Sequence, residues 1–333
     1  MSPNQIYLPE HESPSIAARL KSLKTALPLD FPFALDIEST NLCNLDCFFC
    51  PRKEAAKGEG LMDFAIFKRI VDDCALHGPI RKIGLHKDGE PLAHPQIVDM
   101  VRYIRDKNAA EVISFTSNGI LMKPSKAEQL IEAGLNDVSF SIDATRGDTY
   151  KESKGRDKYE LVEENVRNFL RIKPAEVKVT VKFIRMRENE GQEEGFIEKW
   201  SDAGADILIT EYHDWSGSVR DSSLLGVDSG TASYACENPW YSLAVNWDGK
   251  VSICCVDWDS QAVVGDANVE SIYDIWNGDA LRQIRETHLE GRAHCMNPCS
   301  TCSYKSAESR EVIGGWLMQD ADRLLQVNSA AAG

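Results

Sequence analysis

The chain has 333 residues, of which 43% are hydrophobic and 27% charged, a balance typical of a globular protein with a substantial core. Its net charge of −15 argues against a nucleic-acid substrate, because an acidic chain repels phosphate backbones. We find no apolar run of the roughly 20 residues that span a bilayer and no secretory signal, so we expect a cytoplasmic protein that does not bind a membrane.

Strand-like and helical patterns alternate along the first two thirds of the chain. A polar extension, residues 1–32, holds one helical run at 16–27. The pattern then predicts strands at 33–38, 82–86, 111–116, 137–143, 176–184 and 206–211. Helices are predicted at 63–76, 95–107, 124–133, 159–172 and 192–203, the first of them capped by Asp63. Six such units indicate an α/β fold, a partial or full barrel over residues 33–215, with functional residues after the strands.

The last third of the chain, residues 216–333, has a different composition. Residues 216–234 are rich in Ser, Gly and Asp, which is typical of a linker. An Asp-Gly turn between 241–244 and 251–255 predicts a β-hairpin, and helices are predicted at 271–290 and 307–326. Six of the ten cysteines lie here, and in a reducing compartment they favour metal binding over disulfides.

The first cysteine motif reads Cys43-Asn-Leu-Asp-Cys47-Phe-Phe-Cys50 and directly follows the first predicted strand. Three thiolates on one loop can bind three irons of a [4Fe-4S] cluster and leave the fourth iron open to an outside ligand. Zinc usually takes four protein ligands, often from paired CxxC units. The spacing therefore favours the open cluster, with a zinc site or incidental core cysteines as alternatives.

This motif resembles that of the radical S-adenosylmethionine (SAM) superfamily over residues 33–211, with Phe49 in the aromatic position before the last cysteine. The segment Asp88-Gly89-Glu90-Pro91 is similar to the family's Gly-Gly-Glu-Pro, with Asp88 in place of the first glycine. The resemblance implies a partial (β/α)6 barrel in which the open iron binds SAM. It implies that the backbone of this segment and the Glu90 carboxylate meet the SAM amino group. It also implies that one electron splits SAM into methionine and a 5′-deoxyadenosyl radical, and that Phe49 packs by the adenine.

Further polar residues follow the later strands. The resemblance implies contacts to SAM or substrate from Asn118, Ser141 and Asp143, and Lys182 is a candidate for an anionic group of SAM. His86 and His213 follow the second and sixth strands and are candidates for proton transfer. Each of these residues also has a structural interpretation, as a turn residue, a solvated side chain or a hydrogen-bonded histidine.

The second cysteine group resembles the twitch domain, a shortened form of the SPASM extension of radical SAM enzymes. The matching features are a Cys…GxxxxC hairpin, the pair Ile275-Trp276 and a closing CxxC. The resemblance implies one auxiliary [4Fe-4S] cluster in a small β-hairpin and helix domain, with a four-thiolate zinc site as the alternative. Its expected ligands are Cys236, Cys254, Cys299 and Cys302. Cys255 remains as a buried thiol or a hydrogen-atom donor to a substrate radical, and Cys295 as a replacement cluster ligand or a donor.

The closest resemblance is to the twitch-containing dehydrogenases and epimerases of aminocyclitols and amino sugars. It implies hydrogen abstraction from a small polar substrate of sugar, aminocyclitol or nucleoside type, giving oxidation or epimerisation. It also implies an external electron donor such as flavodoxin or ferredoxin. A SPASM-type peptide or protein maturase is the alternative enzyme, and a non-catalytic Fe-S or zinc-binding protein is the alternative outside catalysis.

Overall fold

The computed structural model describes residues 6–7, 16–54, 57–212, 234–302 and 310–325. Its strands are β1 Ile6–Tyr7, β2 Ala34–Ile37, β3 Ile80–Gly84, β4 Ala110–Ser117, β5 Asp137–Ser141, β6 Lys178–Arg185, β7 Asp206–Glu211, β8 Ser242–Val245, β9 Lys250–Ser252 and β10 Val263–Asp266. Its α-helices are α1 Ile16–Ala26, α2 Phe64–Leu76, α3 Ile97–Asp106, α4 Pro124–Ala133, α5 Gly147–Lys154, α6 Tyr159–Ile172, α7 Glu193–Asp202, α8 Ile272–Asn277, α9 Asp279–Leu289, α11 Gly315–Gln319 and α12 Ala321–Leu325.

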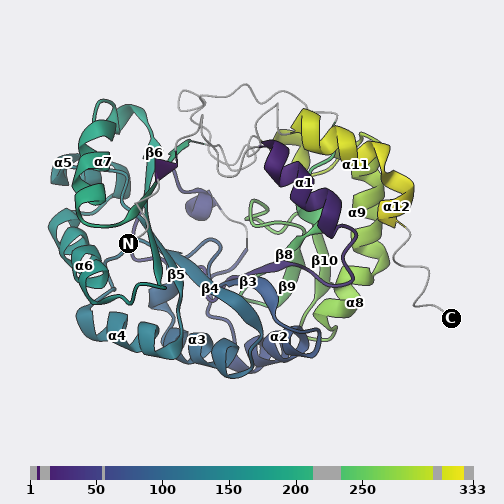
Figure 1. Cartoon of the computed structure of the whole chain (residues 1–333), viewed down its shortest axis with the longest axis horizontal. Helices are drawn as coiled ribbons and strands as arrows, with labels where there is room; N and C mark the ends of the chain where they lie inside the picture. Colours follow the sequence, from purple (N-terminus) through teal and green to yellow (C-terminus); the bar gives the residue numbers. More distant parts are fainter. Residues whose placement is uncertain (1–5, 8–15, 55–56, 213–233, 303–309, 326–333) are drawn as a thin grey trace.

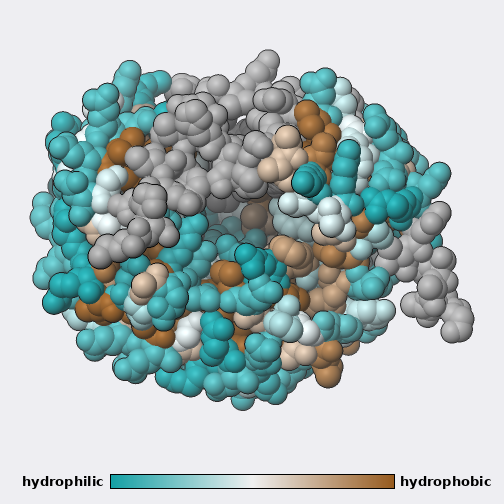
Figure 2. All heavy atoms as spheres, viewed as in Figure 1, coloured by the Kyte–Doolittle hydropathy of each residue, from teal (hydrophilic) through white to brown (hydrophobic). Residues whose placement is uncertain are grey.

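Strands β2 to β7 form a parallel sheet in sequence order, with helices α2, α3, α4, α6 and α7 around its outer face (Figure 1). Within the described residues, the sheet has ten strands in the order β1-β7-β6-β5-β4-β3-β2-β8-β9-β10, and its two edge strands do not pair with each other. The sequence-based prediction of an α/β partial barrel with six parallel strands is therefore confirmed. The face seen in Figure 2 is hollowed near its centre.

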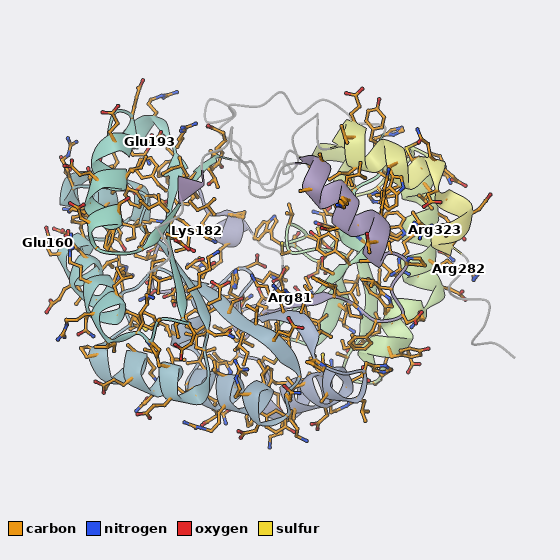
Figure 3. All side chains as sticks on the ribbon, in the orientation of Figure 1. Arg81, Glu160, Lys182, Glu193, Arg282 and Arg323 are labelled. Carbon is orange, nitrogen blue, oxygen red and sulfur yellow. The ribbon has the colours of Figure 1, made fainter. Side chains whose placement is uncertain are left out.

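Alternation along the strands separates the core from the barrel interior. In β6, Val181 and Phe183 are buried, and the Phe183 ring packs against Phe196 of α7 with centroids 4.9 Å apart. The intervening Lys182 therefore faces the inner side of the sheet, where Figure 3 labels it. Helix α2 begins as predicted, because Asp63 accepts a hydrogen bond from the Ala65 amide at 2.6 Å.

The C-terminal region continues the same sheet. Strand β8 pairs in parallel with β2, and β9 and β10 follow in antiparallel order. The predicted hairpin is present as β8 and β9, while β10 was not predicted. One helix was predicted over residues 271–290, which is wrong. The backbone is extended at Gly278, so α8 ends at Asn277 and α9 begins at Asp279.

The N-terminal extension contacts one edge of the sheet and the C-terminal helices. Strand β1 pairs in parallel with β7, while α1 lies beside α11 on the C-terminal side (Figure 1). Leu23 and Leu27 of this segment share a buried apolar cluster with Leu289, Leu317 and Leu324. Residues 1–32 were predicted as a separate extension, and strand β1 was not predicted. Among the described helices, none has the length and apolarity needed to cross a membrane.

Candidate active site

The loop that carries Cys43, Cys47 and Cys50 follows β2, and each of its three thiols is partly accessible to solvent. The start of the loop is tied to a neighbouring segment, because the Thr40 hydroxyl donates to the Gly60 carbonyl at 2.7 Å. The Cys50 amide donates to the Cys47 carbonyl at 3.2 Å, which closes a turn between these two cysteines. The three thiols are thus presented from one short, anchored loop.

Burial raises the pKa of all three thiols, that of Cys47 to about 11. The charge of Cys47 also acts on Cys43, and the charge of Cys43 acts on Cys50, so the side chains lie near one another. Thiols of this kind ionise where a metal centre supplies positive charge, so the donor set fits the [4Fe-4S] cluster that the sequence implies. Within the described ranges, no three His, Cys, Asp or Glu side chains surround a single metal-ion position. In a cubane each cysteine binds a different iron.

Glu90 is buried and organises the loop that follows β3. Its carboxylate accepts hydrogen bonds from the Ser117 hydroxyl at 2.8 Å, the Asn118 amide at 2.7 Å and the Leu92 amide at 3.1 Å. Burial raises its pKa to about 7. The carboxylate expected to meet the SAM amino group is therefore already engaged by three donors of the protein.

The loop after β3 passes very close to the cysteine loop at Gly89. A Cβ atom there would lie 2.3 Å from the Thr40 carbonyl oxygen, so only glycine fits. The Asn118 side chain reaches the same place from β4, donating to Asn44 Oδ1 at 2.7 Å and lying 3.9 Å from the Cys43 sulfur. Three separate segments therefore meet around Cys43.

Asp88 is paired with two lysines. Its Oδ2 accepts from Lys57 Nζ at 2.6 Å and from Lys87 Nζ at 2.9 Å. Lys57 also contacts Glu38 at 3.1 Å, and Lys87 donates to Asn246 Oδ1 at 3.0 Å. Burial raises the pKa of Asp88, but the two lysines outweigh it and the pKa falls below its ordinary value. The negative charge of the acid that replaces the family's glycine is therefore balanced by the two lysines. Through Asn246, this network joins the loop after β3 to the C-terminal region.

Asp143 and Ser141 form a second polar group together with Lys154, a residue that was not predicted for the site. Lys154 pairs with Asp143 and donates to the Ser141 hydroxyl at 3.2 Å. Its Nζ lies 5.0 Å from the centre of the Phe49 ring, and its charge is the largest influence after burial on the pKa of Cys47. Lys154 lies on α5, a short polar helix with no apolar periodicity, so no sequence signal marked it.

An apolar cluster lies beside the cysteine loop. Phe49, Met186 and Tyr212 are buried together, with Cys47 packed against them. The rings of Phe49 and Tyr212 meet edge to face with centroids 6.5 Å apart. The residue expected to pack by adenine therefore lies in apolar surroundings next to Cys47.

The inner side of the sheet carries a separate set of polar groups. Lys182 Nζ donates to the Thr116 hydroxyl at 3.0 Å, and burial lowers its pKa to about 8. Burial lowers the pKa of His86 to about 3, so this imidazole is neutral. Asp36 is buried, which raises its pKa, and it forms a side-chain hydrogen bond with Cys255. Burial likewise raises the pKa of the Cys255 thiol well above its ordinary value.

The second cysteine group gathers around Cys254. Burial is the main cause that raises the pKa of this thiol strongly. The charges of three neighbouring thiols raise it further, in the order Cys299, Cys236 and Cys302. His288 connects two of them: its Nδ1 accepts from the Cys236 amide at 3.1 Å, and its Nε2 lies 3.5 Å from the Cys299 sulfur. Four thiols from three segments therefore meet, a donor set that fits the closed auxiliary cluster implied by the sequence. His288 carried no sequence signal.

The remaining candidates lie elsewhere. Cys295 is exposed on a short helical turn. His213 lies outside the described residues. Cys74 is fully buried in the hydrophobic core of α2.

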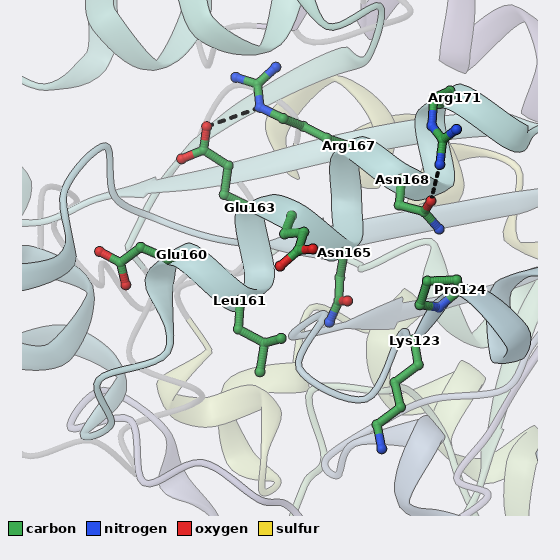
Figure 4. A pocket seen from close by; sticks show the side chains of 10 residues that line it. Lys123, Pro124, Glu160, Leu161, Glu163, Asn165, Arg167, Asn168 and Arg171 are labelled. Atoms are coloured by element: carbon green, nitrogen blue, oxygen red, sulfur yellow. Dashed lines mark hydrogen bonds and ion pairs between the residues drawn. The ribbon is translucent and has the colours of Figure 1, made fainter.

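A charged groove of about 790 Å³ lies on the outer helical side, between the start of α4 and the exposed face of α6 (Figure 4). Its charges pair within the groove itself, as in the contact of Arg167 with Glu163 at 3.0 Å. None of the cysteines lines it.

Comparison with known proteins agrees with this geometry. Residues 37–192 match the radical SAM superfamily, and residues 236–303 match the SPASM iron-sulfur cluster-binding domain. The GTP 3′,8-cyclase of Desulforamulus reducens is 34% identical over 154 residues, which cover 45% of this chain and 46% of that protein. A tungsten-containing aldehyde ferredoxin oxidoreductase cofactor-modifying protein of Pyrococcus furiosus is 34% identical over 109 residues, 33% of this chain and 30% of that protein. The chain thus matches about half the length of these curated relatives, or less.

Solved structures show the same fold at low sequence identity. BtrN in complex with AdoMet and 2-DOIA has a TM-score of 0.58 at 18% identity, covering 82% of this chain and 93% of that one. Streptococcus suis SuiB bound to its precursor peptide SuiA has a TM-score of 0.64 at 14% identity, covering 87% and 75%. The two matched domains imply a SAM-binding [4Fe-4S] cluster and an auxiliary iron-sulfur cluster. The chain therefore joins a radical SAM domain to a SPASM domain and belongs to the radical SAM superfamily.

Proposed function

We propose that this enzyme takes a hydrogen atom from a small polar substrate bound inside the barrel, and that the Cys255 thiol returns one to the opposite face, giving epimerisation. The observation that carries the proposal is the placement of two adjacent cysteines. Cys254 lies among the other thiols of the second group, while Cys255 forms a hydrogen bond with Asp36 of β2 on the inner side of the sheet. A free thiol thus faces the barrel interior rather than a cluster.

The cofactors would be held by the two cysteine groups already described. Cys43, Cys47 and Cys50 would bind the first cluster, and Cys236, Cys254, Cys299 and Cys302 the auxiliary cluster. When bound, the first cluster and SAM supply the 5′-deoxyadenosyl radical that removes the substrate hydrogen atom.

In the proposed step, the S–H bond of Cys255 breaks and a new C–H bond forms at the substrate carbon that lost its hydrogen atom. The sulfur is left as a thiyl radical, which one electron and one proton return to the thiol. The electron comes from a one-electron reductant of the flavodoxin or ferredoxin type. Asp36 orients the thiol through its hydrogen bond, so it acts as a positioning residue.

Oxidation is the second candidate, and His86 favours it. Its Nδ1 is buried without a hydrogen-bond partner among the described residues, and its depressed pKa keeps the ring neutral. A neutral imidazole can take the proton of a substrate hydroxyl while an electron acceptor takes one electron. Structural likeness to SuiB leaves a peptide substrate as the alternative class.

The test is turnover in D₂O with SAM and a reductant, offering aminocyclitols, amino sugars and short peptides in parallel. Epimerisation through Cys255 predicts one solvent deuterium on carbon in the product. The Cys255→Ser variant should still form 5′-deoxyadenosine but no deuterated epimer, while the matched variant Cys295→Ser behaves as the parent. An oxidised product without deuterium would establish the dehydrogenase instead, and a modified peptide would establish the maturase.

A further inference from the structure

Unpaired polar atoms gather on the inner side of the sheet around Gly84, the last residue of β3. In the described part of the chain, His86 Nδ1 and Ser114 Oγ are buried and have no hydrogen-bond partner. Both lie 3.7 Å from the position of a Cβ atom at Gly84, and Asp36 Oδ1 lies 2.8 Å from it. The absence of a side chain at Gly84 therefore lets these three polar groups approach one another.

Two lysines with unused donors face the same interior. Lys182 has one hydrogen bond in the described structure, to Thr116, although its ammonium group carries three protons. Both lysines are half-buried, and in the described part of the chain neither forms an ion pair, although Asp137, Asp143 and Asp36 act on Lys182 by charge. The two ammonium groups also act on each other, since Lys82 contributes to the lowered pKa of Lys182.

The nearby acids do not supply the missing acceptor. Asp143 is engaged by Lys154, and Asp88 is engaged by two other lysines. Asp137 and Asp36 also act on Lys182 by charge, but neither forms an ion pair with it in the described region, and Asp36 forms a hydrogen bond with Cys255. A buried ammonium group without a counter-ion is unfavourable, so an acceptor brought by a ligand would offset that cost.

We propose that Lys182, with His86 and Ser114, binds an anionic oxygen group, a carboxylate or a phosphate, of the small-molecule substrate. This inference rests on the proposed function in that it assumes the substrate occupies the barrel interior. It names the substrate class: an acid-bearing sugar, cyclitol or nucleotide rather than a purely cationic aminocyclitol. Lys182 would donate charge-assisted hydrogen bonds to this anion, which are stronger than hydrogen bonds between neutral groups.

The anion site also predicts which C–H bond can react. His86 and Lys182 act on one another electrostatically, and Asp36, which bonds to Cys255, is influenced by Lys182. The proposed anion site and the Cys255 thiol therefore lie on the same inner side of the sheet. A substrate anchored by its acid group would present a carbon a few bonds away to the thiol.

The test measures anion binding without turnover, so it does not depend on whether Cys255 is the hydrogen donor. The thermal unfolding of the anaerobically reconstituted full chain is followed in sodium phosphate, sodium acetate and sodium chloride at equal ionic strength. Phosphate or acetate should raise the midpoint above that in chloride, because a ligand that binds the folded state stabilises it. The two anions separate a phosphate site from a carboxylate site.

Lys182→Met should weaken anion binding by about tenfold or more, which corresponds to the loss of one charge-assisted contact. Without added anion this variant should be as stable as the parent or more stable, which a merely structural lysine would not allow. Lys178→Met is the matched control, because Lys178 lies on the same strand and face but is exposed at the other end of β6.

His86→Asn gives a second measurement that leaves the charge unchanged, and it should weaken anion binding as well. The proposal is overturned if neither anion stabilises the parent more than chloride, or if Lys182→Met binds both anions as the parent does. It is also overturned if Lys182→Met loses SAM affinity but keeps the anion effect, since Lys182 would then hold the SAM carboxylate.

Discussion

Replacing Asp88 with asparagine should destabilise the protein strongly, because it leaves two buried ammonium groups with too few acceptors. The Lys87 side chain is fully buried and that of Asp88 is 5% exposed. Without the acid, Lys87 keeps only neutral acceptors, namely Asn246 Oδ1 and the Asp257 carbonyl at 2.8 Å. Removing one partner of a buried ion pair costs roughly 3–5 kcal/mol, and because asparagine keeps one acceptor oxygen we expect about 3 kcal/mol.

A double-mutant cycle measured by urea unfolding tests this value. Lys87→Met should also destabilise, and the double variant should lose less than the sum of the two, with a coupling of at least about 1.5 kcal/mol. Asp99→Asn is the matched control, because its contact with Arg102 at 3.2 Å is exposed and should contribute less than about 1 kcal/mol. A loss below about 1 kcal/mol for Asp88→Asn, or additive single effects, would refute the account of this network.

His86→Asn should reduce the loss of stability in acid. The folded-state pKa of about 3 lies below the unfolded value of 6.5, so the neutral ring contributes stability above pH 6.5 that is lost as pH falls, about 1.4 kcal/mol at about pH 5.5. Comparing the free energies of unfolding of the parent and the variant at two pH values checks this. Gly89→Ala should displace the cysteine loop, because its Cβ would clash with the Thr40 carbonyl, and iron analysis should show the loss of one cluster. Lys154→Met should leave Asp143 buried without its cation and weaken SAM binding by about tenfold, which equilibrium dialysis would measure; unchanged binding would place Lys154 outside the SAM site.

The elements with a local signal were predictable from the sequence. Helices at 124–133 and 159–172 and the strand at 206–211 have the predicted bounds, because apolar periodicity and flanking residues define them within a few positions. Strand β3 begins two residues earlier than predicted, since the exposed Arg81 interrupts the apolar pattern at its start. Helix α5 was missed because its polar sequence has no apolar repeat.

The candidate site was predictable where its residues are adjacent in the chain and unpredictable where partners are distant. The spacing of Cys43, Cys47 and Cys50 is visible in eight residues. In contrast, Lys57 and Asn246 are 189 positions apart, and nothing local to either residue indicates the contact. The hydrogen bond of Cys255 with Asp36 likewise depends on β8 pairing with β2, a long-range pairing that no periodicity reports.

The central claim is that two cysteine groups hold two separate clusters. Iron and sulfide content after anaerobic reconstitution tests it directly, on the parent, on a variant with Cys43, Cys47 and Cys50 all replaced by alanine, and on Cys254→Ala. Two cubanes predict about eight irons in the parent and about four in each variant. About four irons in the parent and none in the triple variant, with zinc retained in both, would contradict the claim and make the C-terminal site structural.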